Sequence, residues 1–584
     1  MAAFYKVEGT LVVEAASQSG SAYSEKTIIA FWGEEAISKP YRWRIRTAVG
    51  SANANTYLKT SLVGRGASFT YTLTNTSTNQ SRSEAVHGVV FEVRICGSTV
   101  VNAQPRLVVE FLLKPRLAKL GLNRHSQIYG IGDGLDRPSK ILERLLQPAT
   151  ARTNTLSASI YAGEQPLYVA GGTSGHTYDM NQHMEQQVRA MFVQFQESDL
   201  DFASRLLERE GIFYFFRETA SGEQLVVSAD HATFPAVSGT IPLYKDEASG
   251  QQAGPTGCAY AIDAIMGFGS SASFLKDYNY TAADSADATH PGDASFNNSL
   301  KKGEYKSQAG VITGSYEFAG TDDLRAWGAR TFTDEDVTTP EDNPPDESNL
   351  NRIARVRLEE AICWQNRTDL TTNSPALRPG YIFTLTDQSG ASLNLGGTFL
   401  VVASAVSYVD PQAGPNGLPG ADPETFGAFV NRVTCIDGGL AFRPRRSTPR
   451  PTIPGILVAG VSFASSVDAG TSDMDPTYNT YTIRLIDEES TTTRLPDGST
   501  SPPVRQAQFY GGGETATGTA FPLMDETEVA IAFVHGDPDR PVIVGTLRNA
   551  AAEGVTAGVT PLDPKRLNRL LTSSGAVLEI YDGD

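Results

Sequence analysis

Apolar and polar residues alternate along about the first hundred positions, as they do in half-buried strands. Turn-forming clusters such as NTSTNQS separate the alternating segments. The six segments are VEGTLVVEA, KTIIAFWGE, YRWRIRTAV, SFTYTLTN, HGVVFEVRI and RLVVEFLL. The pattern predicts a β-barrel or a β-sandwich in this part of the chain.

Helical periodicity interrupts the strands in three places. SKILERLLQ predicts a short amphipathic helix with Pro138 near its start. Residues 192–216, FVQFQESDLDFASRLLEREGIFYFF, predict a strand, a helix and a second strand. LNRIARVRLEEAICW, after an acidic and Pro-rich loop, has mixed helical periodicity. The chain is therefore expected to be mainly β with a few short helices.

The ends of the helix within 192–216 are marked by particular residues. Ser198 followed by Asp201 three positions later makes a start like a capping box. Gly211 permits the left-handed conformation that ends a helix. The neighbouring acids Asp199 and Asp201 are accounted for by this helix start, so they need no catalytic role.

A second all-β unit is predicted over residues 455–549. Most of its strands come from TYTIRLID, PPVRQAQFYG, EVAIAFVHG and PVIVGTLRN. Five short strands at this length suit a small closed barrel of the OB type. RLNRLLTSSGAVLEIYDGD, near residue 584, has the pattern of another β element.

The clearest boundary is FRPRRSTPRPTIPG, residues 442–455, which is rich in proline and arginine. Such segments favour an extended, semi-rigid backbone. Its arginines either keep a linker soluble or pair with acidic side chains of a neighbouring domain. The expected division is 1–441, a linker at 442–454, a barrel at 455–549 and a final segment at 550–584.

Length and charge limit the classes of function. The chain has 584 residues, 40% hydrophobic, enough for roughly three to five cores. A net charge of −18 argues against nucleic acid or anionic lipid as a partner, although it also serves simply to keep a large assembly soluble. No secretory signal or transmembrane segment is recognisable, which predicts synthesis in the cytosol and export by another route.

Candidate chemistry is sparse. The four cysteines, Cys96, Cys258, Cys363 and Cys435, form no C-x-x-C pair and are expected to be buried and reduced, although spacing alone does not settle whether any two are bonded. His176 and His183, with Asp179 between them, are a weak candidate for a metal site because no second ligand cluster joins them. GIGDG at 130–134 lacks the third glycine of a dinucleotide loop and is interpreted as a turn. Two polar loops, 281–295 and 333–349, are interpreted as solvated insertions.

One loop stands out, HGDPDRP at 535–541, between two apolar strands. Gly536 permits positive φ, and Asp537 can bond to the backbone of its own turn. Pro538 and Pro541 fix φ and remove donors that a tight loop leaves unpaired. Arg540 can pair with Asp537, with Asp539 or with backbone carbonyls. These residues predict a rigid hairpin.

The stretch FPLMDETEVAIAFVHGDPDRPVIVGTLRNA resembles the OB-fold region of VgrG, the spike protein of type VI secretion systems. That family has Phe-Pro, then Gly-x-Glu-Val, then Gly-Asp-Pro-Asp-Arg-Pro and a closing Asn. This chain matches at Phe521, Pro522, Glu528, Val529, residues 536–541 and Asn549, while Asp525 stands where many members have Gly. Thr527 before the Glu is similar to one branch of the family.

Three further stretches resemble the family in order. They are QFQESDLDFASRLLEREGIFYFF, the Arg-Pro strap at 442–455, and LNRLLTSSGAVLEIYD, which is similar to the Ser-Gly-rich start of the family's needle. The structural signature carried over consists of Glu197, Asp199, Asp201, Arg205, Gly211, Glu528, Gly536, Asp537, Pro538, Asp539, Arg540 and Pro541. The match covers roughly residues 120 to 584.

The resemblance implies a non-enzymatic homotrimer with no cofactor or metal. Its N-terminal part, similar to a contractile-phage tail hub of β-barrel domains, would cap the hexameric Hcp tube. Its OB-fold barrel would join the hub to a triple-stranded β-helix needle tipped by a PAAR protein. The spike would assemble on baseplate components in a Gram-negative cytoplasm and pierce a target envelope mechanically, carrying effector proteins. The chain ends at Asp584, where only the start of such a needle is expected.

Three other functions remain open at this stage. The chain could be the tail spike of a phage-like or extracellular contractile particle, although Thr527 and the strap favour type VI. A spike carrying a cell-wall hydrolase would need an inserted helical domain, and no such insertion is recognisable between hub and barrel. A carbohydrate-binding β-protein would need clustered aromatics, whereas Trp32, Trp43, Trp327 and Trp364 are scattered in sequence.

Overall fold

The structure is a computed structural model that describes the following residues. They are 5–14, 23–50, 62–101, 104–130, 135–147, 166–170, 176–181, 184–186, 191–220, 222–250, 256–269, 272–278, 300–306, 324–327, 349–390, 395–411, 428–461, 480–485, 504–510, 518–519, 521–524, 526–549, 567–571 and 575–581. Within these, the chain is mainly β, as predicted. No helix in this part of the chain is both long and apolar enough to cross a membrane.

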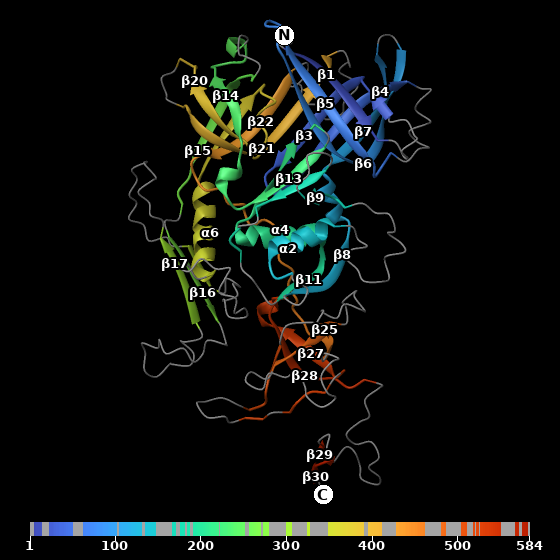
Figure 1. The fold of residues 1–584 in the computed structure, drawn as a ribbon, viewed down its shortest axis with the longest axis vertical. Helices are drawn as coiled ribbons and strands as arrows, with labels where there is room; N and C mark the ends of the chain where they lie inside the picture. The colour runs from blue at the N-terminus through green and yellow to red at the C-terminus, as the bar shows by residue number, and fades with distance from the viewer. Residues whose placement is uncertain are drawn as a thin grey trace. The chain divides into compact units, whose positions relative to one another are not determined.

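The chain forms two compact units (Figure 1). The first comprises Met1–His125, Leu135–Arg189 and Gln196–Arg450. The second comprises Ser126–Gly134, Ala190–Phe195 and Pro451–Asp584. The strap segment as far as Arg450 therefore lies in the first unit, and two short segments from the N-terminal half lie in the second. The domain limits expected from the sequence remain a prediction.

The N-terminal strands of the first unit make one curved sheet in the order β2-β1-β5-β6-β7-β4-β3. All six predicted strands are present, each within a few residues of its expected limits. The bounds are β1 Tyr5–Val13, β2 Tyr23–Glu25, β3 Ile28–Ala36, β4 Lys39–Gly50, β5 Gly66–Asn75, β6 Ser81–Val101 and β7 Gln104–Lys114. The alternation of apolar and polar residues fixes which face of each strand is buried.

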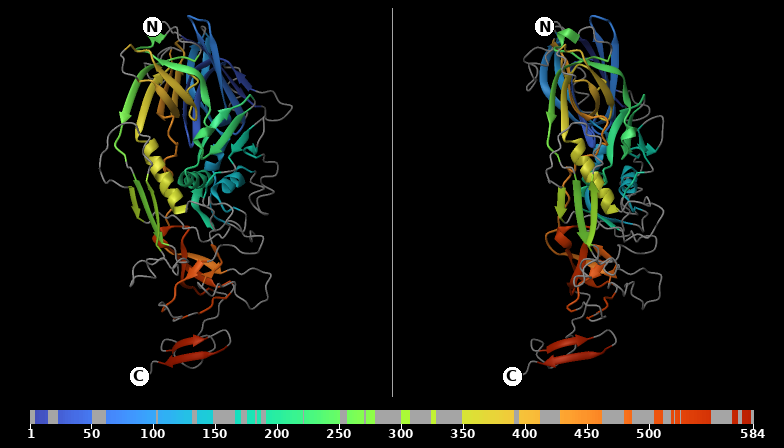
Figure 2. Two further views of the ribbon diagram at one scale, coloured as in Figure 1. Left: turned by 60° about the vertical axis from the view of Figure 1, so that its left-hand side comes forward. Right: turned by 90° about the vertical axis from the view of Figure 1, so that its left-hand side faces the viewer.

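A second set of strands in the first unit closes into a ring (Figure 2). The order is β21-β20-β14-β15-β19-β22, and β22 pairs again with β21. The bounds are β14 Ala236–Leu243, β15 Ala259–Met266, β19 Asn366–Thr372, β20 Ile382–Asp387, β21 Gly397–Val409 and β22 Phe429–Asp437. Closure satisfies the backbone groups that an open sheet would leave at its edges.

The curved sheet and the ring are joined edge to edge. β21 pairs antiparallel with β3, from Ala403 opposite Ala36 to Val409 opposite Ala30. An aromatic cluster packs beneath this seam, and its members come from both sets of strands: Phe31, Trp43, Phe69, Tyr71, Tyr408 and Phe429. Trp43 is only 1% exposed, so it belongs to the core rather than to a sugar-binding surface.

Helices and a smaller sheet complete the first unit. The helices are η1 Arg116–Gly121, α2 Pro138–Leu146, α4 Asp199–Glu210, η3 His231–Thr233, η4 Ala248–Gly250 and α6 Asn349–Cys363. The small sheet has the order β12-β13-β10-β9, with β9 Val169–Ala170, β10 Thr177–Met180, β12 Phe213–Glu218 and β13 Glu223–Ser228. A further sheet has the order β17-β16-β18, with β16 Ala272–Tyr278, β17 Leu300–Lys306 and β18 Leu324–Trp327. The three predicted helices, including the Pro138 start, are confirmed.

The second unit is built on a six-stranded sheet in the order β24-β26-β28-β27-β23-β25. The bounds are β23 Leu457–Val461, β24 Thr480–Tyr481, β25 Ile483–Leu485, β26 Val504–Gln506, β27 Glu528–Phe533 and β28 Pro541–Thr546, with η8 Val534–Gly536 between the last two. Separately, β8 Arg124–Gly130 pairs with β11 Met191–Ser198.

Near the last residue, β29 Leu567–Leu571 and β30 Val577–Tyr581 form an antiparallel hairpin. This confirms the predicted final β element. Several other sequence interpretations lie outside the described residues: most of the GIGDG turn, His183, and almost all of the polar loops 281–295 and 333–349.

Candidate functional site

The signature residues around helix α4 form one local arrangement. The Ser198 hydroxyl accepts a hydrogen bond from the Asp201 backbone N–H at 3.1 Å, and Gly211 ends the helix with φ of +74°. Both predicted helix ends are therefore confirmed. Asp199, at the first helical position, is 1% exposed. Its negative charge lies where the helix dipole favours an anion.

Glu197 and Arg205 make a buried ion pair within the same arrangement. The Arg205 guanidinium donates to both carboxylate oxygens of Glu197, from Nε at 3.0 and 2.9 Å and from Nη2 at 2.6 Å. The Glu197 side chain is 8% exposed and the Arg205 side chain is 6% exposed. A forked pair of this kind fixes orientation as well as charge, so it holds the end of β11 against the helix that follows it.

Gly211 also permits close packing. A Cβ there would lie 2.7 Å from the Val356 side chain and 3.0 Å from Arg443. Arg443, a strap residue, donates to the Gly211 carbonyl at 3.2 Å and to the Glu359 carboxylate at 2.7 Å. The glycine therefore serves both the helix end and the close approach of the strap.

The strap pairs with acidic side chains, as one of its two interpretations predicted. Glu208 accepts the backbone N–H groups of Ser447 and Thr448, each at 2.9 Å. Glu360 accepts the Arg446 N–H at 3.1 Å. These acids lie in the same compact unit as the strap residues, rather than in a neighbouring one. Three of these contacts use backbone N–H groups, which extended Pro-rich chain leaves free, and the Arg443, Ser447 and Thr448 side chains supply the others.

The GDPDRP loop closes the β27–β28 hairpin, as predicted, and its rigidity stays a prediction. Gly536 has φ of +71°, and the Asp537 carboxylate accepts the Asp539 backbone N–H at 3.1 Å. The backbone N–H of Arg540 donates to the Asp537 carbonyl at 2.9 Å, and Pro541 lies opposite Phe533 where β28 begins. The expected pairing of the Arg540 side chain with Asp537, Asp539 or backbone carbonyls stays a prediction. His535 also has positive φ, 55°, which the sequence did not indicate.

The hairpin has a role beyond its own turn. Asp539 is 2% exposed, and its carboxylate accepts the backbone N–H of Val193 at 2.8 Å. Val193 is one of the β11 residues that belong to the second unit. The Gly536 carbonyl accepts the Ile453 N–H at 2.9 Å. The loop therefore anchors two segments that do not adjoin it in sequence.

Those two segments, together with β8, complete the hydrophobic core of the second unit. Ile128, Met191, Val193 and Ile453 pack in one buried cluster with the barrel residues Val529, Ile531 and Ile543. Nearby, the Asn549 side chain donates to the Glu528 carboxylate at 2.9 Å, which brings together two residues of the resembling motif. Short barrels bury little surface alone, so the added apolar residues matter to stability.

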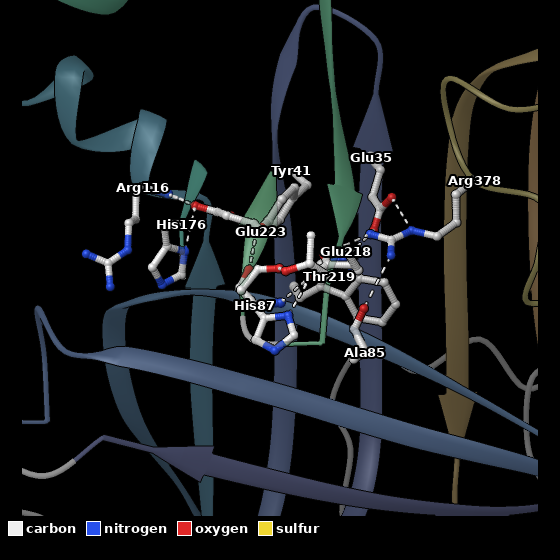
Figure 3. A network of polar contacts seen from close by, with 12 residues as sticks. Glu35, Tyr41, Ala85, His87, Arg116, His176, Glu218, Thr219, Glu223 and Arg378 are labelled. Carbon is white, nitrogen blue, oxygen red and sulfur yellow. Dashed lines mark hydrogen bonds and ion pairs between the residues drawn. The ribbon is translucent and has the colours of Figure 1, made fainter. Parts of the chain in front are cut away.

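Sequence reasoning missed a third arrangement, a buried acid and a nearly buried acid that face each other in the first unit (Figure 3). Glu218 and Glu223 lie directly opposite each other across the β12–β13 hairpin. Glu218 contacts the Arg378 guanidinium at 3.4 Å and the His87 ring at 2.7 Å. Arg378 also forks onto Glu35 at 2.8 and 3.0 Å. The only signal in the sequence was an acid on each side of a short turn, a pattern too common to single out.

The candidate metal site gains no support from geometry. His176 Nδ1 lies 3.9 Å from Glu223, and burial, with smaller effects of Arg116 and His87, lowers its pKa to about 4. No group of three or more His, Cys, Asp or Glu side chains suited to a metal occurs among the described residues. All four cysteines are free, and Cys258, Cys363 and Cys435 are buried as expected.

The chain is similar to proteins of a known family. The family model described as phage tail baseplate hub (GPD) matches residues 34–411, well over half of the chain. The type VI secretion system spike protein VgrG1b of Pseudomonas aeruginosa is 24% identical over 365 residues, covering 61% of this chain and 42% of that protein. The actin cross-linking toxin VgrG1 of Vibrio cholerae is 23% identical over 365 residues, covering 62% of this chain and 28% of that protein.

A solved structure shows the same fold. It is the E. coli c3393 protein, described as a component of the type VI secretion system with structural similarity to the T4 bacteriophage tail proteins gp27 and gp5. The TM-score is 0.50 at 18% identity, over 92% of this chain and 99% of that one. The chain spans less than half the length of the two relatives named above. It belongs to the phage tail baseplate hub family, and it is similar to VgrG spike proteins.

Proposed function

We propose that the chain is the hub and the first part of the spike of a type VI secretion system. The observation that carries this proposal is the pairing of β3 with β21, which joins a curved sheet and a closed ring within one chain. Closure and edge pairing leave fewer unpaired backbone groups along these sheets, and we infer that this helps a hub that transmits force. The family match and the VgrG relatives support the same role.

The assembly proposed is a homotrimer. In the β29–β30 hairpin, five large apolar side chains are at least 39% exposed: Leu570, Leu571, Val577, Leu578 and Ile580. A two-stranded hairpin is marginal by itself in water, so cover from other copies would stabilise it. This fits the start of a triple-stranded β-helix.

The remaining partners follow from the resemblance. The hub would cap an Hcp tube, the needle would be tipped by a PAAR protein, and effectors and baseplate components would attach to the spike. The protein would be made in the cytoplasm and exported with the machine. We also propose that these residues carry no enzymatic activity, in keeping with the match to the phage tail baseplate hub family.

The mass of the full chain in solution, measured by light scattering over a range of concentrations, tests the trimer. The expected result is a mass near three times 62.6 kDa. A chain that stays monomeric at the highest concentration contradicts the proposed assembly.

Binding to an Hcp hexamer, measured by sedimentation, separates type VI from a related particle. Because the matching family is described as a phage tail baseplate hub, the alternative is the tail spike of a phage-like particle. Co-sedimentation with Hcp supports the type VI role, whereas a trimer that ignores Hcp supports the alternative.

A further inference from the structure

Glu223 and Glu218 face each other across one hairpin but have different surroundings. Like charges directly opposite in a sheet destabilise it unless something compensates them. Glu218 has the Arg378 guanidinium and the His87 ring within reach. Glu223 is fully buried and has no cationic side chain within hydrogen-bond distance among the described residues.

The partners of Glu223 are all neutral donors from other elements. Its Oε1 accepts the Tyr168 hydroxyl at 2.7 Å and the backbone N–H of Arg116 at 2.7 Å. Its Oε2 contacts the Tyr41 hydroxyl of β4. Three separate parts of the chain thus meet at one carboxyl group, which joins the β12–β13 hairpin to the curved sheet.

The Tyr41 hydroxyl has one proton to donate but lies against two oxygen atoms. The same Tyr41 hydroxyl also contacts the backbone carbonyl of His87 on β6. A phenol has one proton to donate, and a carbonyl can only accept. If Glu223 were a carboxylate, one hydroxyl would lie between two acceptors and could satisfy only one of them. A proton on Oε2 of Glu223 removes the conflict, because Glu223 then donates to Tyr41 and Tyr41 donates to His87.

We propose that Glu223 is protonated in the folded hub, and that this proton completes the hydrogen bonds that hold the β12–β13 hairpin against the curved sheet. We define the Glu223 latch as Glu223 with Tyr41, Tyr168 and the backbone of Arg116. Removal of the proton places two acceptors against the Tyr41 hydroxyl and a second negative charge opposite Glu218. The latch is therefore closed in the protonated state and loosened in the deprotonated one.

The charged and titratable groups around the latch favour the neutral acid. Those that face it are Tyr41, His87, Tyr168, His176, Glu218 and Arg116, the last of which touches Glu223 through its backbone only. His176 is held neutral near pH 7, because its pKa is lowered to about 4 mainly by burial. Burial raises the pKa of Glu223 from 4.5 to about 7, despite the hydrogen bonds from Tyr41, Arg116 and Tyr168 that lower it.

The sign of the pH effect follows from this raised pKa. The unfolded chain loses the Glu223 proton near pH 4.5, whereas the folded hub retains it to about pH 7. The stabilisation is therefore fully present below about pH 4.5 and is lost as the pH rises through about 7. A hub that passes between compartments of different pH would be tightened by acid and loosened by base at this position.

Glu223→Gln is the sharpest test, because the glutamine amide copies the proposed neutral acid. Its oxygen can accept from Tyr168 and Arg116, and its NH₂ can donate to Tyr41. We expect the melting temperature of the wild-type chain, relative to this variant, to fall by roughly 5 °C between about pH 5 and pH 8. Parallel profiles for the two proteins would overturn the proposal.

Glu218→Gln is the matched control on the opposite strand. This change removes the negative charge that faces Arg378 and His87, so it should lower the melting temperature at every pH between about 5 and 8. By contrast, Glu223→Gln should not lower the melting temperature near pH 8. If both variants are destabilised equally and keep the same pH profile, Glu223 is an ordinary charged residue and the proposal fails.

Infrared spectroscopy of the wild-type chain tests the proton without relying on a variant. A protonated carboxyl has a carbonyl stretching band distinct from that of a carboxylate. We expect such a band at about pH 6 and its loss at about pH 8. Burial also raises the pKa of Glu247, so Glu247→Gln should leave the Glu223 band in place. If no protonated band remains in Glu247→Gln at pH 6, the latch is not protonated.

Discussion

The β27–β28 hairpin and the β12–β13 hairpin each carry two buried or nearly buried acids. In the first, Asp537 and Asp539 accept backbone N–H groups, one within the turn and one from Val193. In the second, Glu218 and Glu223 accept from side chains and from two backbone N–H groups of other elements. The first hairpin is thus shaped mostly by its own residues, and the second by where the rest of the chain brings its partners.

The difference shows two ways to bury an acid. A carboxylate in a tight turn is compensated by backbone donors that the turn itself leaves unpaired. A buried carboxyl group outside such a turn needs either a nearby cation from another part of the sequence or a proton. Glu218 has the cation, and we propose that Glu223 has the proton.

The largest expected effect comes from removing the Arg378 guanidinium, the cation that contacts Glu218. Arg378→Met leaves Glu35 and Glu218 without their guanidinium, and an uncompensated buried charge costs about 3–5 kcal/mol. Calorimetry of the first unit's unfolding transition should show this loss. Arg42→Met is the control, because its pair with Glu34 is 57% and 59% exposed and should contribute about 0–1 kcal/mol. Equal effects would show that burial does not distinguish the two pairs.

The next effect tests the local geometry of the GDPDRP hairpin. In Gly536→Ala the new Cβ would lie 2.5 Å from the Thr452 methyl carbon, at a φ of +71°. We expect a loss of about 2–3 kcal/mol in the unfolding of the second unit. Gly545→Ala, in the adjoining strand, would meet nothing within 4 Å and should change stability little. A similar loss in both variants would contradict the role given to positive φ.

The contact between this hairpin and β11 should matter less. Asp539→Ala removes the acceptor for the Val193 N–H and leaves a buried donor unsatisfied, which costs about 1–2 kcal/mol. Hydrogen exchange should also speed up at the Val193 amide. Asp539→Asn keeps an acceptor oxygen and should retain most of the protection. If the alanine variant exchanges no faster, the carboxylate does not anchor β11.

The smallest effect concerns the two prolines. Replacing Pro538 and Pro541 with alanine frees the unfolded chain, and each change is expected to destabilise by about 0.4–1 kcal/mol. The melting temperature of the second unit should fall by a few degrees. An unchanged value would refute the idea that the prolines keep this loop rigid.

The local elements could be predicted from short stretches of sequence. Alternation predicted the strands of the curved sheet, and Ser198 and Gly211 predicted the ends of α4. Gly536, Asp537 and the prolines predicted the hairpin. These succeed because periodicity, capping and turn geometry depend on residues a few positions apart. The ordered motifs also pointed to the spike family, and the family match supports that interpretation.

Which residues from distant parts of the sequence meet depends on the tertiary structure. It placed Ile128, Met191 and Val193 in the core of the second unit, although more than two hundred positions separate them from its barrel strands. It also brought Tyr41 to Glu223 across 182 positions. An acid in a sequence carries no mark of the group that will face it, because that group is selected by the path of the whole chain. The surroundings that set whether an acid keeps its charge or its proton are therefore a property of the fold.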